Sequence, residues 1–370
     1  MTSEIVAPVK TPAAAVNESI DRFRPFSPAR CAVVVGCNPV RTVSGSLYGL
    51  AYGDALGKST EFMLMPDIIA AYGPSGPVSL EGDPALVTDD TQMALAVAWA
   101  LCEAPSLTPA DVGPRLRERF LAWANSPDNN RAPGRTCMRA CSLLADGRRW
   151  QEASVMSSKG CGANMRVTPV GLLPGIDVDT LAGLAQLQAG LTHGHPTGLA
   201  AAELTAYAVW ALLDGATLAE LPAGLRARAY DQRTVYRGDW LGDLWKYFTY
   251  DPSAEEYIAR GWDECVSVLD RLETALLRPD RTADPCLYTG AGFVAEEALA
   301  TALLCAIMFA DEPVAGLGRA AATSGDSDSI ACLAGAFLGA AHGESAWPEE
   351  WATQIEYADQ LRALSQALTG

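Results

Sequence analysis

Two short acidic turns, far apart in the chain, carry side chains that could bind divalent cations. The first is Thr88-Asp89-Asp90 and the second is Asp326-Ser327-Asp328-Ser329, and each precedes an apolar segment of helical composition. Each turn offers two carboxylates and a neighbouring hydroxyl, and such carboxylates repel one another unless a cation lies between them. Mg²⁺ and Mn²⁺ prefer oxygen ligands of this kind. The pair of turns therefore predicts a metal site.

Two other interpretations of these turns were weighed. Asp, Ser and Thr at a helix start accept hydrogen bonds from free N–H groups, but one oxygen is enough for that purpose. Capping alone therefore leaves the additional acids of the two turns unexplained. Asp326 and Asp328 also fit the spacing of a phosphatase-type nucleophile. That motif follows a buried strand, whereas residues 315–325 have the composition of a loop and a helix end.

The elements that must position these turns are predicted to be helices. Ala/Leu/Val-rich segments separated by Gly and Pro predict helices at 91–103, 109–124, 197–214, 254–277, 294–309, 329–341 and 349–368. Only residues 31–36 resemble a short strand, and the proline-rich residues 1–30 predict a poorly ordered arm. We therefore expect an N-terminal arm, partly disordered or a short strand, over 1–40. A single all-α domain, a compact many-helix bundle, is expected over 41–370.

Composition and charge narrow the classes of function. The chain has 370 residues, 49% of them hydrophobic, and a formal net charge of −17 at pH 7. This charge repels phosphate backbones and argues against a broad nucleic-acid surface, although the total is better explained by an acidic surface that only maintains solubility. An anionic ligand would need a local positive charge, which a bound cation supplies.

The compartment is predicted from cysteines and from apolar segments. The ten cysteines include no CxxC pair, and most lie in apolar stretches, as expected of core thiols in a reducing cytoplasm. The N-terminus lacks the pattern of a secretory signal, and its longest apolar piece, 31–36, is too short to cross a bilayer. We therefore expect a cytoplasmic protein with no membrane partner.

Six segments, in order along residues 44–355, resemble the ADP-ribosylglycohydrolase family. They are Gly49–Gly57 followed by Glu61-Phe62, then Thr88–Met93, Gly160–Val167, Thr192–Pro196, Gly292–Leu299 and Gly325–Ser329. Each segment alone is a weak signal, but six in family order are a strong one. The resemblance implies a compact orthogonal bundle of helices with a central dimetal cleft, in agreement with the helical composition.

The same resemblance implies a set of metal ligands and an acid near them. The ligands of two Mg²⁺ (or Mn²⁺) ions would be Thr88, Asp89, Asp90, Asp326, Asp328 and Ser329. Glu61 corresponds to the family's mobile glutamate near the metals. The alternative for Glu61 is a surface carboxylate on a loop.

The resemblance also implies residues that contact the substrate. His193 would touch it, although a capping or packing role is the alternative, and His195 is expected to be structural. The glycines of Gly160-Cys161-Gly162 let backbone N–H groups approach a phosphate, with Asn164 and Met165 on the same segment; the alternative is a plain glycine-rich loop. Many relatives have Asn where Cys161 stands and a small or apolar residue where Asn164 stands. Because of these departures, the sequence does not show which group carries the ADP-ribose.

The function implied is a metal-dependent hydrolase that cleaves the bond at C1 of ADP-ribose attached to a protein side chain or similar acceptor. The metals would orient the ribose and a water, with Glu61, or else Asp90, moving the proton. The partner would be ADP-ribose or an ADP-ribosylated substrate, and the protein a monomer. Two alternatives remain: a hydrolase of small free ADP-ribosyl or nucleotide metabolites, and a non-catalytic ADP-ribose-binding or structural relative. The intact acidic turns argue against the second.

Overall fold

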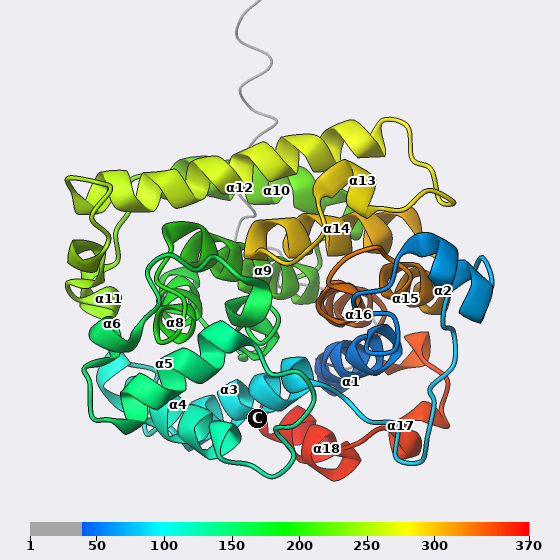
Figure 1. Cartoon of the computed structure of the whole chain (residues 1–370), viewed down its shortest axis with the longest axis horizontal. Coiled ribbons are helices and arrows are strands. Elements are labelled where there is room, and N and C mark those ends of the chain that lie inside the picture. Colours follow the sequence, from blue (N-terminus) through cyan, green and yellow to red (C-terminus); the bar gives the residue numbers. More distant parts are fainter. Residues whose placement is uncertain (1–38, 370) are drawn as a thin grey trace, which may run out of the picture.

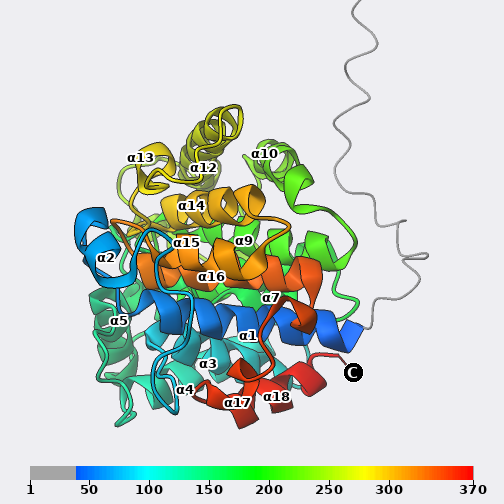
Figure 2. The ribbon, with the colours of Figure 1, turned by 90° about the vertical axis from the view of Figure 1, so that its right-hand side faces the viewer.

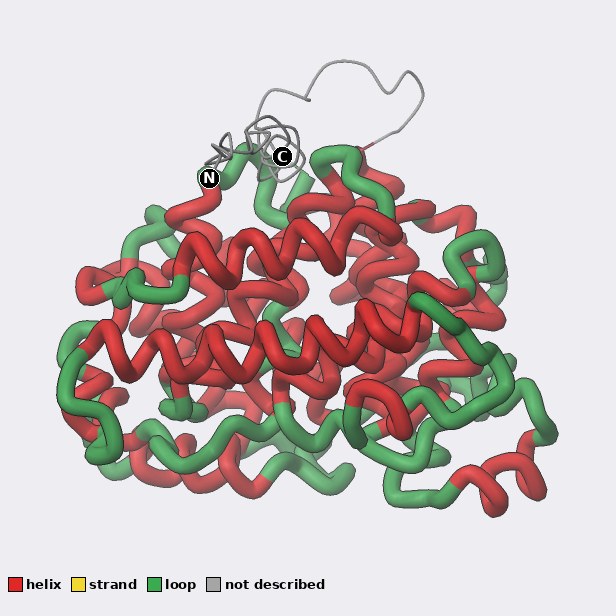
Figure 3. The backbone as a smooth tube through the Cα atoms, turned by 90° about the horizontal axis from the view of Figure 1, so that it is seen from above, coloured by secondary structure: helices red, strands yellow, loops and turns green. Residues whose placement is uncertain are grey.

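The computed structural model describes residues 39–369 and confirms the all-α fold. Within this range the chain forms α-helices, short 3₁₀ turns and loops, with three isolated β-bridges and no strand (Figure 3). The longer helices are α1 (Pro39–Gly57), α2 (Met65–Tyr72), α3 (Asp89–Glu103), α4 (Pro109–Ala124), α5 (Arg135–Ala145), α8 (Val178–Gly190), α9 (Pro196–Leu213), α10 (Leu221–Gln232), α12 (Ala254–Leu276), α14 (Ala295–Met308), α15 (Pro313–Ala321), α16 (Ser327–His342) and α18 (Ala358–Ala367). Short helices are α6 (Trp150–Ala153), α7 (Thr168–Gly171), α11 (Gly238–Leu241), α13 (Cys286–Thr289) and α17 (Trp351–Gln354).

Helix α9 lies in the middle of the bundle and is apolar on nearly all sides. Sixteen of its residues are buried, because α8, α12, α14 and α16 all pack against it (Figure 1). A helix that is hydrophobic all round is expected in such a central position. The amphipathic α12 instead covers one face of the bundle, with its apolar side toward α9 and α14.

Helices α1 and α16 run antiparallel in backbone contact, and this contact positions both acidic turns (Figure 2). A Cβ atom added to Gly53 would lie 2.0 Å from the carbonyl oxygen of Ala331, and one added to Gly57 would lie 2.4 Å from the Cα atom of Asp328. Only glycine fits at these two positions. The close approach brings the end of α1 against the start of α16, where Asp328 stands.

Alanine at Gly53 is therefore expected to push α1 and α16 apart. Overpacking of a core costs about 1–3 kcal/mol, and this contact is with backbone that cannot rotate away, so we expect a loss of about 3 kcal/mol in the free energy of unfolding. The measurement is urea unfolding. Gly238→Ala, at the start of α11, is the matched control, because the nearest atom to a Cβ atom added there is Tyr236 Cδ1 at 4.0 Å, which is ordinary contact. Alanine is the better helix former, so this control should be as stable as the wild type or more so. Equal stability of the two variants would contradict the packing described.

The predicted helices are confirmed except at the C-terminus. Those at 91–103, 109–124, 197–214, 254–277, 294–309 and 329–341 correspond to α3, α4, α9, α12, α14 and α16, with ends that differ by at most two residues. The predicted helix 349–368 is wrong as a single element. It is divided into α17 and α18 because the intervening backbone pairs with Ala85, whose N–H donates to Gln354 O (2.8 Å) and whose carbonyl accepts from Glu356 N (2.9 Å).

Two predictions concern the arm and the membrane. The strand-like segment 31–36 and most of the arm 1–40 lie outside the described residues. In the part of the chain that is described, every helix is too short or too polar to span a lipid bilayer.

Candidate metal centre

The second acidic turn and the segment after α1 meet in one carboxylate cluster. Carboxylate oxygens of Glu61, Asp326 and Asp328 all lie within 4.8 Å of one another. Asp328 is buried in the first turn of α16, whereas Glu61 and Asp326 keep some contact with solvent. The structure thus brings together residues that stand 265 positions apart (326 − 61), as the sequence predicted.

The Glu61 segment is tied down by its neighbour Thr60. The Thr60 hydroxyl lies 2.5 Å from the carbonyl oxygen of Ala321 and 3.0 Å from Ser327 Oγ, and the Glu61 N–H donates to Gly57 O (3.0 Å). These bonds hold the segment against the start of α16. Thr60 carries no motif signal in the sequence, so its anchoring role was not predicted.

The first acidic turn is held by Asp54, in the last turn of α1. Its carboxylate is fully buried and accepts four hydrogen bonds, from Thr88 N (2.9 Å), Thr88 Oγ1 (2.8 Å), Thr91 N (3.0 Å) and Thr91 Oγ1 (2.5 Å). Sequence analysis quoted Asp54 only as part of a motif and gave it no role. The structure shows that it fixes the start of α3 to the end of α1.

The two aspartates of the first turn have different partners. Asp89 Oδ2 accepts from Gly134 N (3.1 Å). Asp90 Oδ2 is buried and has no hydrogen-bond partner among the described residues. A buried carboxylate oxygen without a donor is costly, and a cation is the partner that its charge favours. This unpartnered oxygen fits the metal site predicted from the sequence.

Electrostatics link the two turns into one site. Burial raises the pKa of Glu61 to about 8 and that of Asp89 to about 7, and the negative charge of Asp328 adds to both shifts. The pKa values of Asp90 and Asp326 are raised well above the usual range by burial and then by Asp328. Carboxylates placed so closely are stable as anions only with positive charge between them. Their chemistry therefore fits hard divalent cations.

The hydroxyl of Ser329 and the Gly160 segment also lie at this cluster. Burial and the charges of Asp326 and Asp90 raise the pKa of the Cys161 thiol well above its usual range, which places that thiol beside the acids. The Ser329 hydroxyl lies 4.0 Å from the sulfur of Met165. The predicted substrate segment therefore does border the acidic cluster.

The backbone N–H groups of that segment are partly used by the protein. Cys161 N donates to Phe293 O (3.1 Å) and Gly160 N to Ser158 Oγ (3.4 Å). The Asn164 side chain is fully buried and donates to Ala295 O (3.0 Å) at the start of α14. Asn164 thus anchors the segment from inside. The substrate roles of Gly160, Cys161, Gly162, Asn164 and Met165 stay predictions.

His193 lies against the same segment. Its ring edge faces Gly160 and Gly162, since a Cβ atom at Gly162 would be 3.1 Å from His193 Cε1. Burial, with the nearby Arg166 charge, lowers its pKa to about 3, so the imidazole is neutral at physiological pH. His195 caps α9 instead, with Nδ1 accepting from Thr197 N (3.2 Å). This contact agrees with the structural role expected for His195.

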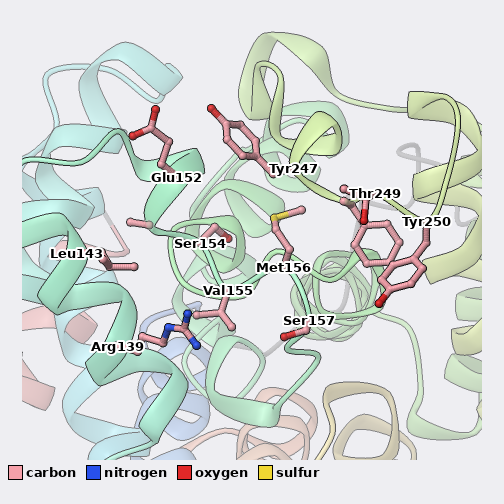
Figure 4. Close-up of a pocket in the computed structure, with 12 residues that line it drawn as sticks. Arg139, Leu143, Glu152, Ser154, Val155, Met156, Ser157, Tyr247, Thr249 and Tyr250 are labelled. Atoms are coloured by element: carbon pink, nitrogen blue, oxygen red, sulfur yellow. The ribbon is translucent and has the colours of Figure 1, made fainter.

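A cavity of about 280 Å³ lies before the Gly160 segment in the chain, between α5 and residues 247–250 (Figure 4). Residues 152–157 line it together with 247–250 and two residues of α5, and Tyr247 and Tyr250 stand on one side of it with Arg139 on the other. The next residue, Ser158, lies 2.9 Å from Thr136 Oγ1 at the start of α5, two positions after Gly134, which binds Asp89. Ser158 therefore connects the chain that lines the cavity to the start of α5.

Comparison with known proteins identifies the family of this chain. A sequence model of the ADP-ribosylglycohydrolase family matches residues 39–370. ADP-ribosylhydrolase ARH3 of Bos taurus is 25% identical over 366 residues, which are 90% of this chain and 94% of that protein. ADP-ribosyl-dinitrogen reductase glycohydrolase of Rhodospirillum rubrum is 33% identical over 161 residues, 42% of this chain and 53% of that protein.

A solved structure shares the fold. It is titled ADP-ribosylglycohydrolase-related protein complex and superposes with a TM-score of 0.60 at 24% identity, covering 89% of this chain and 97% of that one. The match of the family model over all of the described residues confirms the resemblance seen in the six motifs. The chain therefore belongs to the ADP-ribosylglycohydrolase family.

Proposed function

We propose that this chain is a hydrolase that uses two Mg²⁺ or Mn²⁺ ions to cleave the glycosidic bond at C1 of ADP-ribose attached to a protein side chain or similar acceptor. The family acts on glycosidic linkages of ADP-ribose, and its members are metal-dependent. The observation that carries the proposal for this chain is the buried, unpartnered Asp90 Oδ2 beside the cluster of Glu61, Asp326 and Asp328.

The chain's own residues divide into ligands and a proton carrier. The ligands that would hold the metals are Thr88, Asp89, Asp90, Asp326, Asp328 and Ser329. When bound, the metals supply positive charge that stabilises an anionic, oxygen-rich substrate and lowers the pKa of a bound water. Glu61 lies at the solvent edge of the cluster, so its carboxyl oxygen can take a proton from the attacking water or give one to the leaving acceptor atom. Asp90 is the second candidate for that transfer.

The site also accounts for an anionic ligand in an acidic protein. The net charge of −17 would repel a diphosphate. Local cations would reverse that sign where the diphosphate lies. His193 faces the Gly160 segment as a neutral group and adds no charge of its own.

A second candidate function is hydrolysis of a small free ADP-ribosyl or nucleotide metabolite. It is favoured by Cys161, whose buried thiol stands beside Asp326 where many relatives carry Asn. A thiol is a weaker hydrogen-bond donor and acceptor than an amide, so the ligand would be held differently there. The non-catalytic alternative is disfavoured because a binding protein does not need a complete set of metal ligands.

The experiment is a hydrolysis screen with and without EDTA. The substrates are ADP-ribosylated arginine, serine and nucleic acid, and free nucleotide ribosides, with release of ADP-ribose or the free ribosyl product as the readout. We expect turnover of at least one ADP-ribosylated acceptor, loss of turnover in EDTA, and recovery with Mg²⁺ or Mn²⁺. Turnover of the free metabolites alone selects the second candidate. ADP-ribose binding by calorimetry without any turnover selects the non-catalytic one.

Compartment and oligomeric state complete the proposal. All eight cysteines described, from Cys102 to Cys332, are free, which supports a reducing compartment such as the cytoplasm. The monomeric state stays a prediction, which sedimentation of the purified chain tests.

A further inference from the structure

His193 has two ring nitrogens in different surroundings. Nδ1 lies 2.8 Å from the hydroxyl oxygen of Thr192. The opposite edge, with Nε2, faces Gly160 and Gly162, and among the described residues no protein group pairs with Nε2. A neutral imidazole carries one proton, and the partner of Nδ1 determines which nitrogen holds it. The Thr192 hydroxyl is therefore the group to analyse.

The Thr192 hydroxyl accepts a hydrogen bond from a fully buried arginine. Arg166 uses all five of its N–H donors inside the protein: Nε–H to Gln188 Oε1 (2.7 Å), Nη2 to Gln188 O (2.6 Å) and Thr192 Oγ1 (2.8 Å), and Nη1 to the sulfurs of Met93 and Cys137 (both 3.5 Å). Its guanidinium also lies over the ring of Phe120, 4.3 Å from the centroid. Arg166 cannot turn, so one of its protons is fixed on Thr192 Oγ1.

The proton of that hydroxyl must then go to another acceptor. Two are in reach: His193 Nδ1 at 2.8 Å and the carbonyl oxygen of Ala189 at 3.4 Å. The Ala189 oxygen already accepts from Thr192 N (3.1 Å) and His193 N (2.8 Å), so both of its lone pairs are used. The nearer, unused acceptor is Nδ1. Thr192 therefore donates to Nδ1, and the imidazole proton lies on Nε2.

Charge favours the same arrangement. An Nδ1–H group would direct its positive end toward a hydroxyl that already receives a proton from the Arg166 cation. The lone pair of Nδ1 is attracted to that hydroxyl instead. Burial and the Arg166 charge also keep the ring neutral, since they lower the His193 pKa to about 3.

We propose that Arg166 and Thr192 are positioning residues that fix His193 as the Nε2–H tautomer, and that this N–H donates to an acceptor oxygen of the substrate beside the Gly160 segment. The second half rests on the proposed function, because it takes ADP-ribose as the ligand. Phosphate and ribose hydroxyl oxygens are both acceptors. His193 is then a donor that neither titrates nor turns, and it adds no charge to the site.

The tautomer is measurable directly, because the chain contains only three histidines. Long-range ¹H–¹⁵N NMR of the full chain, labelled with ¹⁵N-histidine and free of ADP-ribose, distinguishes the two neutral tautomers from each other and from the imidazolium. We expect the Nε2–H pattern for His193 at neutral pH. His195 is an internal reference with the same expected pattern, because its Nδ1 accepts from Thr197 N. A His193 spectrum of the Nδ1–H form or of the imidazolium would overturn the proposal.

Two substitutions at Thr192 test its role. Thr192→Val keeps the shape but removes the hydroxyl, so the His193 signals should shift toward the Nδ1–H form. Thr192→Ser keeps the hydroxyl and should restore the wild-type pattern. A purely structural role of Thr192 would leave the His193 tautomer unchanged. An unchanged pattern in folded Thr192→Val therefore contradicts the proposed positioning by Arg166 and Thr192. If the valine variant does not fold, the wild-type and serine spectra still decide the tautomer.

Calorimetry with ADP-ribose in the presence of Mg²⁺ tests the donor role separately. One hydrogen bond to a charged oxygen corresponds to about a tenfold change in affinity. We expect Thr192→Val to bind ADP-ribose about tenfold more weakly and Thr192→Ser to bind as the wild type does. Equal affinity of folded Thr192→Val overturns the donor role. If the wild type shows the Nε2–H spectrum but does not bind ADP-ribose, the proposed function is contradicted, whereas the positioning of His193 by Arg166 and Thr192 is supported.

Discussion

Replacement of Asp328 by asparagine should abolish turnover and leave the metal-free protein at least as stable as the wild type. Asp328 raises the pKa of Glu61, Asp89 and Asp90, so its charge is unfavourable to the metal-free fold. Asparagine has nearly the same shape, and its side-chain oxygen can still accept from Ser329 N (2.9 Å). Loss of a metal ligand removes several kcal/mol of transition-state stabilisation, which corresponds to about a thousandfold in rate.

The measurements are turnover of the ADP-ribosylated substrate and the melting temperature in EDTA. Asp89→Asn, in the other turn, should give the same result. Asp311→Asn is the matched control, because that aspartate is exposed on the loop after α14 and belongs to neither acidic turn. Its activity should be that of the wild type. Near-normal turnover in both Asp328→Asn and Asp89→Asn would mean that the turns do not hold catalytic metals.

Removal of metal should lower the melting temperature, and more so as the pH rises. Without a cation, the folded-state pKa values are about 6 for Asp54, 7 for Asp89 and 8 for Glu61, whereas the unfolded values are about 4. The native state therefore binds more protons than the unfolded state between about pH 4 and pH 8. Under that condition the free energy of unfolding falls as the pH rises through this window.

Bound cations cancel this loss, because they stabilise the deprotonated carboxylates. Metal at a hundred times its dissociation constant stabilises the fold by about 2.7 kcal/mol per site, which for two sites is roughly 7 °C in a chain of this size. We expect a small rise with Mg²⁺ or Mn²⁺ at pH 5 and the full rise at pH 8, by differential scanning calorimetry. NaCl at equal ionic strength is the control. A metal-induced rise that is equal at both pH values, or larger at pH 5, would contradict the buried acidic site.

Sequence patterns predicted the two turns and the helices well for a physical reason. An Asp-rich turn before an apolar segment is a local feature, and α3 and α16 begin within two residues of the positions expected. The meeting of the two turns in space was predicted on two grounds. Their carboxylates repel one another unless they share a cation, and the family motifs imply one dimetal site. Asp54 and Thr60 were missed because their roles depend on long-range hydrogen bonds that no local spacing encodes.

Other features depend on tertiary contacts and could not be predicted from the sequence. The division of the last predicted helix depends on Ala85, about 270 residues away, and on Glu356, whose carboxylate accepts from Val87 N (3.1 Å) and Arg131 Nη2 (2.9 Å). The hydrogen bonds that connect Arg166, Thr192 and His193 could not be predicted from the sequence either, because Arg166 and Thr192 come into contact only in the folded bundle. In the sequence, Arg166 is only the basic residue of the glycine-rich segment Gly160–Val167, and nothing nearby indicates its partners.

The most direct test is a crystal structure of the full chain grown with Mn²⁺, with anomalous diffraction recorded at the manganese edge. Two anomalous peaks are expected in the space enclosed by Asp89, Asp90, Asp326 and Asp328, each bonded to at least one carboxylate. Absence of any peak there at saturating Mn²⁺, or peaks that touch only exposed carboxylates elsewhere, would contradict a dimetal centre in this protein.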